Sequence, residues 1–207
     1  YRFNWNFPIA FSKHDSSKLY TFSNHVHLST DEGQSWETIS PDLTRNDKTK
    51  LVSSGGPITQ DNTGVEYYAT LFAVDESPIQ EGLIWVGSDD GLIHLTKDGG
   101  NTWENVTPKK MPDWMMINSI DASSFDSGTA YIAGTRYKLG DFTPYLYVTD
   151  DYGKNWKPIT DGIKDEHFTR VLRSDKSNKN ILYAGTETGM YISYDRGNSW
   201  NEFQKNL

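Results

Sequence analysis

Short runs in which hydrophobic and polar residues alternate recur along the whole chain, as expected for half-buried β-strands. Four of these runs lead directly into the same polar phrase. They are His25–Leu28, Leu92–Leu95, Tyr145–Val148 and Met190–Ile192. Repeated strand-like runs with turn residues between them predict an all-β protein.

The repeated phrase is Ser/Thr-x-Asp-x-Gly-x-x-Trp, and its fixed positions are occupied in every copy. A short Asp side chain can accept hydrogen bonds from the amides of its own turn, and Gly adopts a positive φ at little cost. Trp then offers a large packing surface to a neighbouring repeat. We interpret all the fixed residues as structural: Ser29, Asp31, Gly33, Trp36, Thr96, Asp98, Gly100, Trp103, Thr149, Asp151, Gly153, Trp156, Ser193, Asp195, Gly197 and Trp200.

Each repeat is predicted to form four antiparallel strands, because further apolar runs stand before and after each phrase. The phrases are 67, 53 and 44 residues apart. The shortest spacing matches the period of about 40 to 50 residues of a β-propeller blade. We therefore predict a single β-propeller segment with four visible blades, at approximately residues 1–40, 66–107, 115–160 and 168–204.

The longer repeats contain two insertions, at residues 41–65 and 135–144. The first joins the outer strand of one blade to the inner strand of the next, and the second joins the second and third strands of blade three. Both kinds of connection open on the propeller face opposite the repeated turns. Since long loops on a rigid scaffold often carry binding sites, we predict that this insertion face is the functional one.

The repeated phrase is the Asp-box, or BNR, motif, and the chain resembles the Asp-box β-propellers, which include sialidases, xyloglucanases and sortilin-type ectodomains. Other phrases resemble the bacterial sortilin-like BNR-repeat proteins, often labelled glycosyl hydrolases. They are Tyr1–Asn6, Gly55–Gly64, Trp85–Gly91 and Tyr183–Gly189. The resemblance covers nearly the whole chain. It implies a bacterial protein that is secreted, periplasmic or at the cell surface, and a ring of more than four blades. The remaining blades of the same propeller are therefore expected partners.

Composition excludes several classes of function. The net charge of −8 and the sequence pI of about 5.1 argue against a nucleic-acid groove, which needs a basic stripe. The absence of cysteine excludes disulfides and thiolate chemistry, and no stretch is apolar enough for a membrane span. The histidines show no metal-ligand spacing and no nucleotide-binding loop is present, so we predict neither a metal nor a cofactor.

Carboxylates on the insertion face are the candidates for catalysis, because glycosidases need two carboxyl groups flanking the sugar. The candidates are Asp61, Asp89, Asp90 and Glu187. Asp89 and Asp90 occupy the turn equivalent to that of Glu187, and both turns also have a purely local explanation as hairpins. The sequence therefore leaves open whether the protein is an enzyme.

Aromatic side chains near the same loops suggest a binding surface, because exposed rings suit sugars and peptide side chains. The same rings could instead cap the ends of the core. The predicted ligand-binding set is Trp5, Asp61, Asn62, Asp89, Asp90, Trp114, Tyr137, Tyr145 and Glu187.

The leading hypothesis is an extracytoplasmic binding module that holds a protein, peptide or glycan ligand on its insertion face. The alternative is a glycoside hydrolase of xyloglucanase-like type that acts on a polysaccharide. A third reading is a purely structural part of a larger secreted assembly. Because propellers serve all three purposes, the fold alone cannot choose among them.

Overall fold

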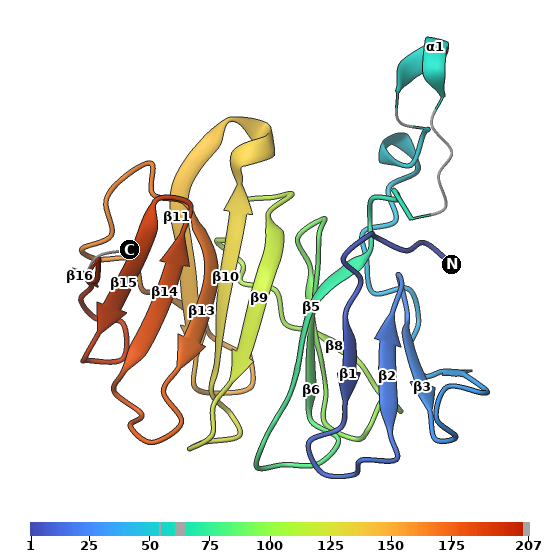
Figure 1. Ribbon diagram of the computed structural model, residues 1–207, viewed down its shortest axis with the longest axis horizontal. Coiled ribbons are helices and arrows are strands. Elements are labelled where there is room, and N and C mark those ends of the chain that lie inside the picture. Colours follow the sequence, from blue (N-terminus) through green and yellow to red (C-terminus); the bar gives the residue numbers. More distant parts are fainter. Residues whose placement is uncertain (54, 61–64, 205–207) are drawn as a thin grey trace.

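The computed structural model describes residues 1–53, 55–60 and 65–204. These residues form four four-stranded antiparallel sheets, each built from four consecutive strands. The sheets stand side by side, with the N-terminal sheet at one end of the row and the C-terminal sheet at the other (Figure 1). The predicted all-β propeller architecture with four four-stranded blades is confirmed.

Every blade is a simple meander whose outermost strand is only two residues long. Blade 1 contains β1 (Ile9–Phe11), β2 (Leu19–Phe22), β3 (Val26–Ser29) and β4 (Glu37–Thr38). Blade 2 contains β5 (Leu71–Glu76), β6 (Ile84–Ser88), β7 (Ile93–Thr96) and β8 (Glu104–Asn105). Blade 3 contains β9 (Met116–Ala122), β10 (Ala130–Arg136), β11 (Asp141–Thr149) and β12 (Lys157–Pro158). Blade 4 contains β13 (Thr169–Ser174), β14 (Leu182–Thr186), β15 (Gly189–Ser193) and β16 (Asn201–Glu202).

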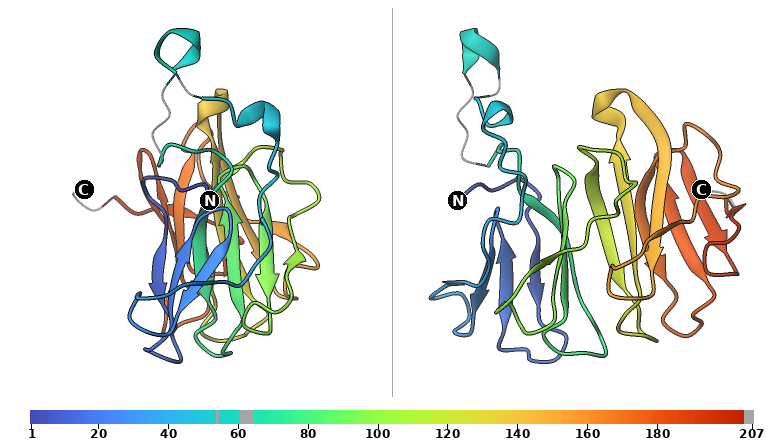
Figure 2. Two further views of the ribbon diagram at one scale, coloured as in Figure 1. Left: turned by 90° about the vertical axis from the view of Figure 1, so that its right-hand side faces the viewer. Right: turned by 180° about the vertical axis from the view of Figure 1, so that it is seen from behind.

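The short helices lie in the two insertions. The first insertion carries the 3₁₀ turn η1 (Lys48–Lys50) and the single helical turn α1 (Gly56–Thr59), and the second carries η2 (Tyr137–Leu139). Both insertions lie at the top of Figure 1, and Figure 2 shows α1 projecting from the blades. None of the helices in the described parts of the chain is long and apolar enough to cross a membrane.

Strand register is the same in all four blades, so residues can be matched from blade to blade. We call the side of a blade that faces the next blade in the sequence its front face, and the opposite side its back face. At the middle of the second strand an aromatic side chain always points to the front: Tyr20, Trp85, Tyr131 and Tyr183. The next residue of the second strand points to the back face, and its partner on the inner strand is always aliphatic and points to the same face. These inner-strand partners are Ile9, Val74, Ile120 and Leu172.

The core is divided among the three joints between blades, where one front face meets the next back face. Between blades 1 and 2, Tyr20 and Phe22 pack with Ile84 and Val86. Between blades 2 and 3, Trp85 and Leu95 pack with Ile117 and Ile132. Between blades 3 and 4, Tyr131 and Leu146 pack with Leu172 and Tyr191. Stability therefore depends on pairs of blades, because one sheet alone leaves both of its faces uncovered.

The repeated turns follow the third strand of each blade and use the same hydrogen bonds each time. In blade 2, Asp98 Oδ1 accepts from Thr96 Oγ1 at 2.8 Å and from the amide of Thr102 at 2.9 Å. The Thr102 hydroxyl donates to Asp98 Oδ2 at 2.6 Å, and the Gly100 amide donates to Thr96 Oγ1 at 2.9 Å. These bonds lower the pKa of Asp98 to about 2, the hydroxyl of Thr102 contributing most.

The Trp of each of the last three turns donates a hydrogen bond across the joint to the blade before it. The acceptor is the carbonyl of the residue that follows the outer strand of that blade. The indole pairs are Trp103 with Ile39 at 2.9 Å, Trp156 with Val106 at 2.7 Å and Trp200 with Ile159 at 2.7 Å. The turn glycine lies against the same residue, and a Cβ on Gly153 would come within 2.6 Å of Val106. Each turn thus fixes both its own hairpin and the neighbouring blade.

Candidate functional site

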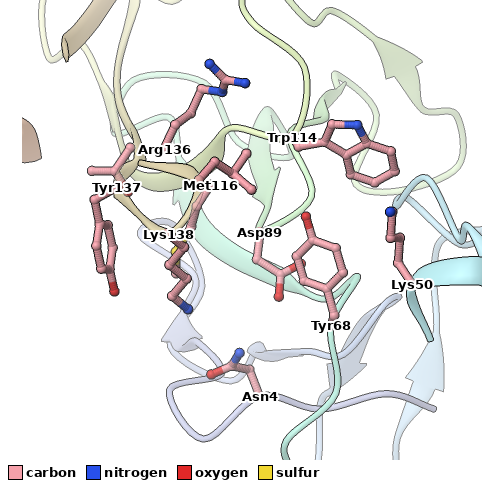
Figure 3. Close-up of a pocket in the computed structure, with 11 residues that line it drawn as sticks. Asn4, Lys50, Tyr68, Asp89, Trp114, Met116, Arg136, Tyr137 and Lys138 are labelled. Carbon is pink, nitrogen blue, oxygen red and sulfur yellow. The ribbon is translucent and has the colours of Figure 1, made fainter. Parts of the chain in front are cut away.

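A pocket of about 360 Å³ opens between blades 2 and 3 on the insertion face. Its lining comes from segments that are far apart in the sequence. Lys50 comes from the first insertion, Tyr68 from the segment before β5, Asp89 from the β6–β7 turn, Trp114 from the loop before β9 and Tyr137 from the second insertion. Figure 3 shows these side chains arranged around a common space.

Asp89 is the carboxylate of this pocket, and it is 6% exposed. The Thr70 amide donates to Asp89 Oδ1 at 2.8 Å, and the Thr70 hydroxyl donates to Oδ2 at 2.9 Å. Burial nevertheless raises the pKa of Asp89 to about 7, because these two bonds do not offset the loss of water. Asp89 can therefore change its protonation state near neutral pH, and in the neutral form it can donate a hydrogen bond.

Trp114 and Tyr68 form one wall of the pocket. Their ring centroids are 6.4 Å apart and the rings are stacked at 30°. The Arg45 guanidinium lies 4.9 Å from the Trp114 ring centroid, and the Lys50 ammonium lies 5.8 Å from it. Trp114 is held at a φ of 61°, an uncommon conformation for a residue other than glycine. The indole is therefore fixed in place by an aromatic ring and two cations.

The second insertion forms the opposite wall through Arg136 and Tyr137. Arg136 pairs with Asp141 at 2.6 Å, and the Tyr145 hydroxyl donates to the same carboxylate at 2.8 Å. Burial alone would raise the pKa of Asp141, but hydrogen bonds led by the one from Tyr145 lower it to about 2. Tyr145 thus helps to hold Asp141, the ion-pair partner of Arg136, and is not part of the pocket lining.

Tyr137 lines the pocket and also packs against Phe168 and Arg170. Its ring stacks on Phe168 with centroids 5.2 Å apart, and the Arg170 guanidinium lies 4.4 Å from its centroid. Arg170 in turn pairs with Glu187 at 2.7 Å. Glu187 therefore contributes to the pocket at most through Arg170 and Tyr137, and it does not meet Asp89 in one lining.

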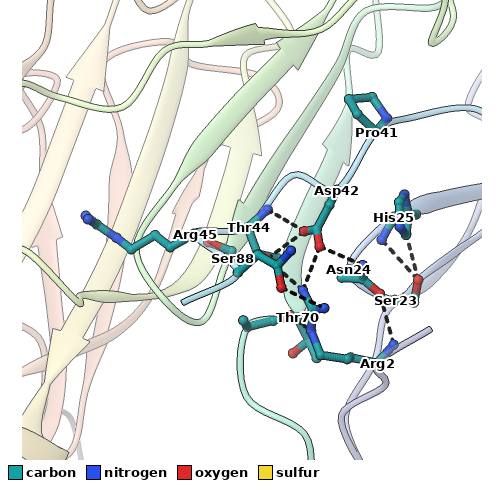
Figure 4. A network of polar contacts seen from close by, with 12 residues as sticks. Arg2, Ser23, Asn24, His25, Pro41, Asp42, Thr44, Arg45, Thr70 and Ser88 are labelled. Carbon is teal, nitrogen blue, oxygen red and sulfur yellow. Dashed lines mark hydrogen bonds and ion pairs between the residues drawn. The ribbon is translucent and has the colours of Figure 1, made fainter. Parts of the chain in front are cut away.

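Asp90 is completely buried, and it anchors the first insertion instead of facing the pocket. Its carboxylate accepts from the Arg45 amide at 2.8 Å and from the Ser88 hydroxyl at 2.6 Å. Burial raises its pKa above the ordinary aspartate value. A hydrogen-bond network beside it, centred on Arg2 and Asp42, fixes the base of the same insertion (Figure 4).

The remaining predicted ligand-binding residues lie apart from the pocket or outside the described residues. Trp5 is 66% exposed, and its indole donates to Glu66 at 3.1 Å, so it belongs to the outer rim of the insertion face. Asp61 and Asn62 lie outside the described residues. Of the predicted binding set, the pocket brings together Asp89, Trp114 and Tyr137.

The other lining residues are absent from the predicted ligand-binding set, although several lie in the two insertions that were predicted to form the functional face. They are Asn4, Lys50, Tyr68, Met116, Thr135, Arg136, Lys138 and Leu139. Lys50 lies in the first insertion and Lys138 in the second, so the position of the insertions is the signal that could have found them. In the described part of the chain, no three His, Asp or Glu side chains converge as metal ligands would.

Comparison with known proteins agrees with the fold. Residues 144–207 match the sortilin family, described as Sortilin-Vps10 and as sortilin, neurotensin receptor 3. The uncharacterized protein YCR101C of Saccharomyces cerevisiae is 25% identical over 124 residues, which are 54% of this chain and 63% of the yeast protein.

Two solved structures share the architecture over nearly the whole chain. An ancestral GH74 enzyme superposes with a TM-score of 0.71 and 19% identity, covering 100% of this chain and 25% of the enzyme. The GH74 xyloglucanase from Xanthomonas campestris gives a TM-score of 0.69 and 17% identity, covering 96% of this chain and 30% of that enzyme. The chain thus spans 63% of the yeast relative and 25–30% of these two enzymes.

The repeated turns, the four-stranded blades and the similar structures all indicate a β-propeller fold. At these identities the likeness to the GH74 enzymes concerns the fold. The chain is therefore a β-propeller in its fold, and its residues 144–207 match the sortilin family model.

Proposed function

We propose that the chain is an extracytoplasmic binding module, and that its ligand site is the pocket between blades 2 and 3. The observation that carries this proposal is convergence: separate loops bring Lys50, Tyr68, Asp89 and Trp114 to one concave, largely apolar space of about 360 Å³. Pockets of this kind, with a few polar groups placed among aromatic rings, are the usual form of ligand sites. The ligand is a protein, peptide or glycan.

The electrostatics of the pocket favour a ligand that combines apolar and polar groups. Asp89 can donate or accept, depending on its protonation state. Lys50 and Lys138 reach the pocket from opposite sides (Figure 3), and neither forms an ion pair with a carboxylate of the described residues. The rings of Trp114 and Tyr68 supply the apolar contact. The preformed wall keeps the cost of ordering side chains on binding low.

Calorimetric titration with xyloglucan oligosaccharides and with an array of peptides tests the proposal. Trp114→Ala is expected to weaken binding of the identified ligand at least about tenfold, which corresponds to roughly 1.4 kcal/mol. Trp5→Ala is the matched control, because Trp5 is an exposed tryptophan on the same face that does not line the pocket. Binding that Trp114→Ala leaves unchanged would place the ligand elsewhere.

One observation favours a second candidate function, a glycoside hydrolase of xyloglucanase-like type. A buried carboxyl whose pKa is raised to about 7 has the property required of the general acid of a glycosidase. The mechanism needs a second carboxyl across the sugar, and Asp89 is the one carboxylate among the described lining residues. We therefore place the binding function first.

Release of reducing sugar from xyloglucan decides between the two functions. Asp89→Asn should abolish activity if Asp89 is the acid, whereas Glu187→Gln should leave it unchanged because Glu187 lies outside the pocket. Circular dichroism of both variants controls for folding. The binding module predicts no sugar release by the parent chain, while its ligand still binds.

A further inference from the structure

A groove of about 630 Å³ lies along the outer strands at the joint between blades 2 and 3. One side is β8 with the segment that follows it, residues 104–110, and the other is the Asp-box turn of blade 3, residues 153–156. Tyr147 and Pro158 complete the lining. We call this surface the rim groove. It shares no lining residue with the pocket on the insertion face, so it is a separate surface of the molecule.

Much of the lining of the rim groove is apolar. Val106 and Pro108 are buried, Trp156 is half-buried and Pro158 is exposed. The indole N–H of Trp156 is already bonded to the Val106 carbonyl at 2.7 Å, and its ring meets Trp85 at 77° with centroids 6.0 Å apart. Trp156 and the prolines therefore offer carbon surface to a partner, and this surface suits a hydrophobic side chain.

Three lysines surround this apolar surface: Lys109, Lys110 and Lys154. All three are exposed, and none of them lies within ion-pair distance of a carboxylate in the described part of the chain. The acidic side chain of the lining, Glu104, is paired with Lys97 at 3.3 Å. The rim groove is thus a positive surface on a chain whose net charge is −8. Such a surface attracts a partner of opposite charge and fixes its register.

The corresponding groove between blades 1 and 2 lacks these charges. Trp103 donates to the Ile39 carbonyl there, as Trp156 donates to Val106, so positions can be matched by counting from these residues. The joint forms without lysines, and the lysines of the rim groove are therefore not required to hold two blades together. The matched positions of the first and second joints are Asn101 with Lys154, Asp42 with Lys109 and Leu43 with Lys110.

The joint between blades 3 and 4 closes the same region with its own atoms. The Trp200 amide donates to the Asp161 carbonyl at 2.9 Å, and the Lys157 ammonium donates to Asn198 Oδ1 at 2.6 Å. Trp200 is only 4% exposed as a result, whereas Trp156 is half-buried. Among the three joints, the second therefore combines an open apolar surface with unpaired cations.

The neutral polar side chains of the rim groove favour a peptide over a glycan as its occupant. The Thr107 hydroxyl accepts from the Ile93 amide at 2.9 Å, and Asn155 Nδ2 donates to Asp151 at 2.7 Å. Asn105 Oδ1 accepts from the Thr107 amide at 3.0 Å. Specific recognition of sugar hydroxyls requires polar groups directed at the ligand, and these groups are directed at the chain itself. A carboxylate beside a hydrophobic side chain requires only the cations and the carbon surface that the groove presents.

We propose that the rim groove is a second binding surface, which holds a peptide segment of a partner protein that carries acidic residues beside large hydrophobic ones. The carboxylates of the segment meet Lys109, Lys110 and Lys154, and its hydrophobic side chains lie against Trp156 and Pro158. This site is independent of the pocket and of the function proposed for it, because the two surfaces have no lining residue in common.

Fluorescence anisotropy with a short labelled peptide of alternating Asp and Leu tests the proposal. We expect saturable binding that weakens as the salt concentration is raised. Lys154→Glu should weaken binding at least about tenfold, and Lys110→Glu is the second variant if Lys154→Glu lowers the folded fraction. Lys179→Glu is the matched control, because it makes the same change of charge at an exposed lysine outside the rim groove. Peptides with Asn for every Asp, or with Ala for every Leu, should bind at least about tenfold more weakly.

Further measurements separate the rim groove from other sites and other occupants. Trp114→Ala alters the pocket and should leave binding of this probe unchanged. Polygalacturonate, an acidic glycan, should bind more weakly than the peptide. The proposal is overturned if the folded parent chain does not bind the probe, if both charge reversals leave binding unchanged, or if Lys179→Glu weakens it equally. It is also overturned if the glycan binds more tightly, or if sedimentation velocity shows that Lys154→Glu dissociates a dimer of this chain.

Discussion

Two aspartates of blade 2 show how differently the two ends of the propeller use the same side chain. Asp98, in the Asp-box turn, is bonded to the hydroxyls and amides of its own turn, and its pKa falls to about 2. Asp89, in the turn at the opposite end of β7, is buried with Thr70 as its partner, and its pKa rises to about 7. The ionised form of Asp98 is stabilised by donors of its own turn, whereas burial makes ionisation of Asp89 unfavourable. Asp98 at the Asp-box end thus supports the fold, whereas Asp89 at the insertion end remains available for chemistry or binding.

The largest effect on stability is expected at the Asp-box end. Trp200→Ala should lower the free energy of unfolding by about 3–5 kcal/mol, because Trp200 is 4% exposed and donates across the joint to Ile159. Trp36→Ala should cost clearly less, because the equivalent side chain is 43% exposed. Urea unfolding of both variants measures the difference. Equal losses would show that the joint contributes little to the stability of these turns.

At the insertion end, the raised pKa of Asp89 predicts a dependence of stability on pH. The folded chain keeps the proton on Asp89 up to about pH 7, whereas the unfolded chain loses it near the ordinary aspartate pKa of 3.8. Stability should therefore fall as pH rises through this window, by up to about 4 kcal/mol at one pKa unit per 1.36 kcal/mol. Asp89→Asn should remove this decline. Urea melts at mildly acidic and mildly alkaline pH test it, and the same slope in the variant would assign the decline to other groups.

A smaller effect is expected from adding one methyl group at a joint. Gly153→Ala should cost about 1–3 kcal/mol, because the new Cβ would come within 2.6 Å of Val106 at a φ of 79°. Gly140→Ala is the control, since Gly140 has a similar φ of 75° and no atom within 4 Å of its Cβ position. Thermal melts of the two variants separate the clash from the backbone strain. An equal loss at both positions would leave strain as the whole cause.

The smallest effect is expected for Asp98→Asn, and its pH dependence has the opposite sign to that of Asp89. The folded pKa of Asp98 is lowered to about 2, so its contribution is present above the unfolded value of 3.8 and is lost as pH falls between the two values. The variant should resist this acid-side loss and be slightly less stable at neutral pH. Acid titration of the folded fraction measures both. A variant with an unchanged acid transition would contradict the account of the turn.

The repeated end of the molecule was predictable because its chemistry is local. Thr96, Asp98, Gly100 and Trp103 stand within eight residues, and their hydrogen bonds follow from that spacing. The pocket was predictable in part: Asp89, Trp114 and Tyr137 stand in loops that a propeller places on one face. Lys50 and Tyr68 complete it from other segments, and no local pattern reveals a contact that depends on how two insertions fold.

Asp89 and Asp90 show the limit of sequence reasoning most clearly. They are adjacent in one turn and have the same side chain. Asp89 nevertheless lines the pocket, whereas the Asp90 carboxylate accepts a hydrogen bond from the Arg45 amide. This difference arises from the first insertion, which places Arg45 beside the carboxylate of Asp90. Its path depends on the network around Arg2 and Asp42, which joins residues 40 positions apart.

The direction of the joint hydrogen bonds has a consequence for how such a gene can change length. Blades 2, 3 and 4 each carry an indole donor at the repeated turn, and blades 1, 2 and 3 each carry an acceptor carbonyl after the outer strand. A duplication or recombination that inserts a complete blade therefore introduces both halves of a joint and leaves every junction matched. A break within a blade would leave an unmatched donor or acceptor and an uncovered core face. Selection on folding alone would then favour gain and loss in units of one blade, whatever ligand the insertion face comes to hold.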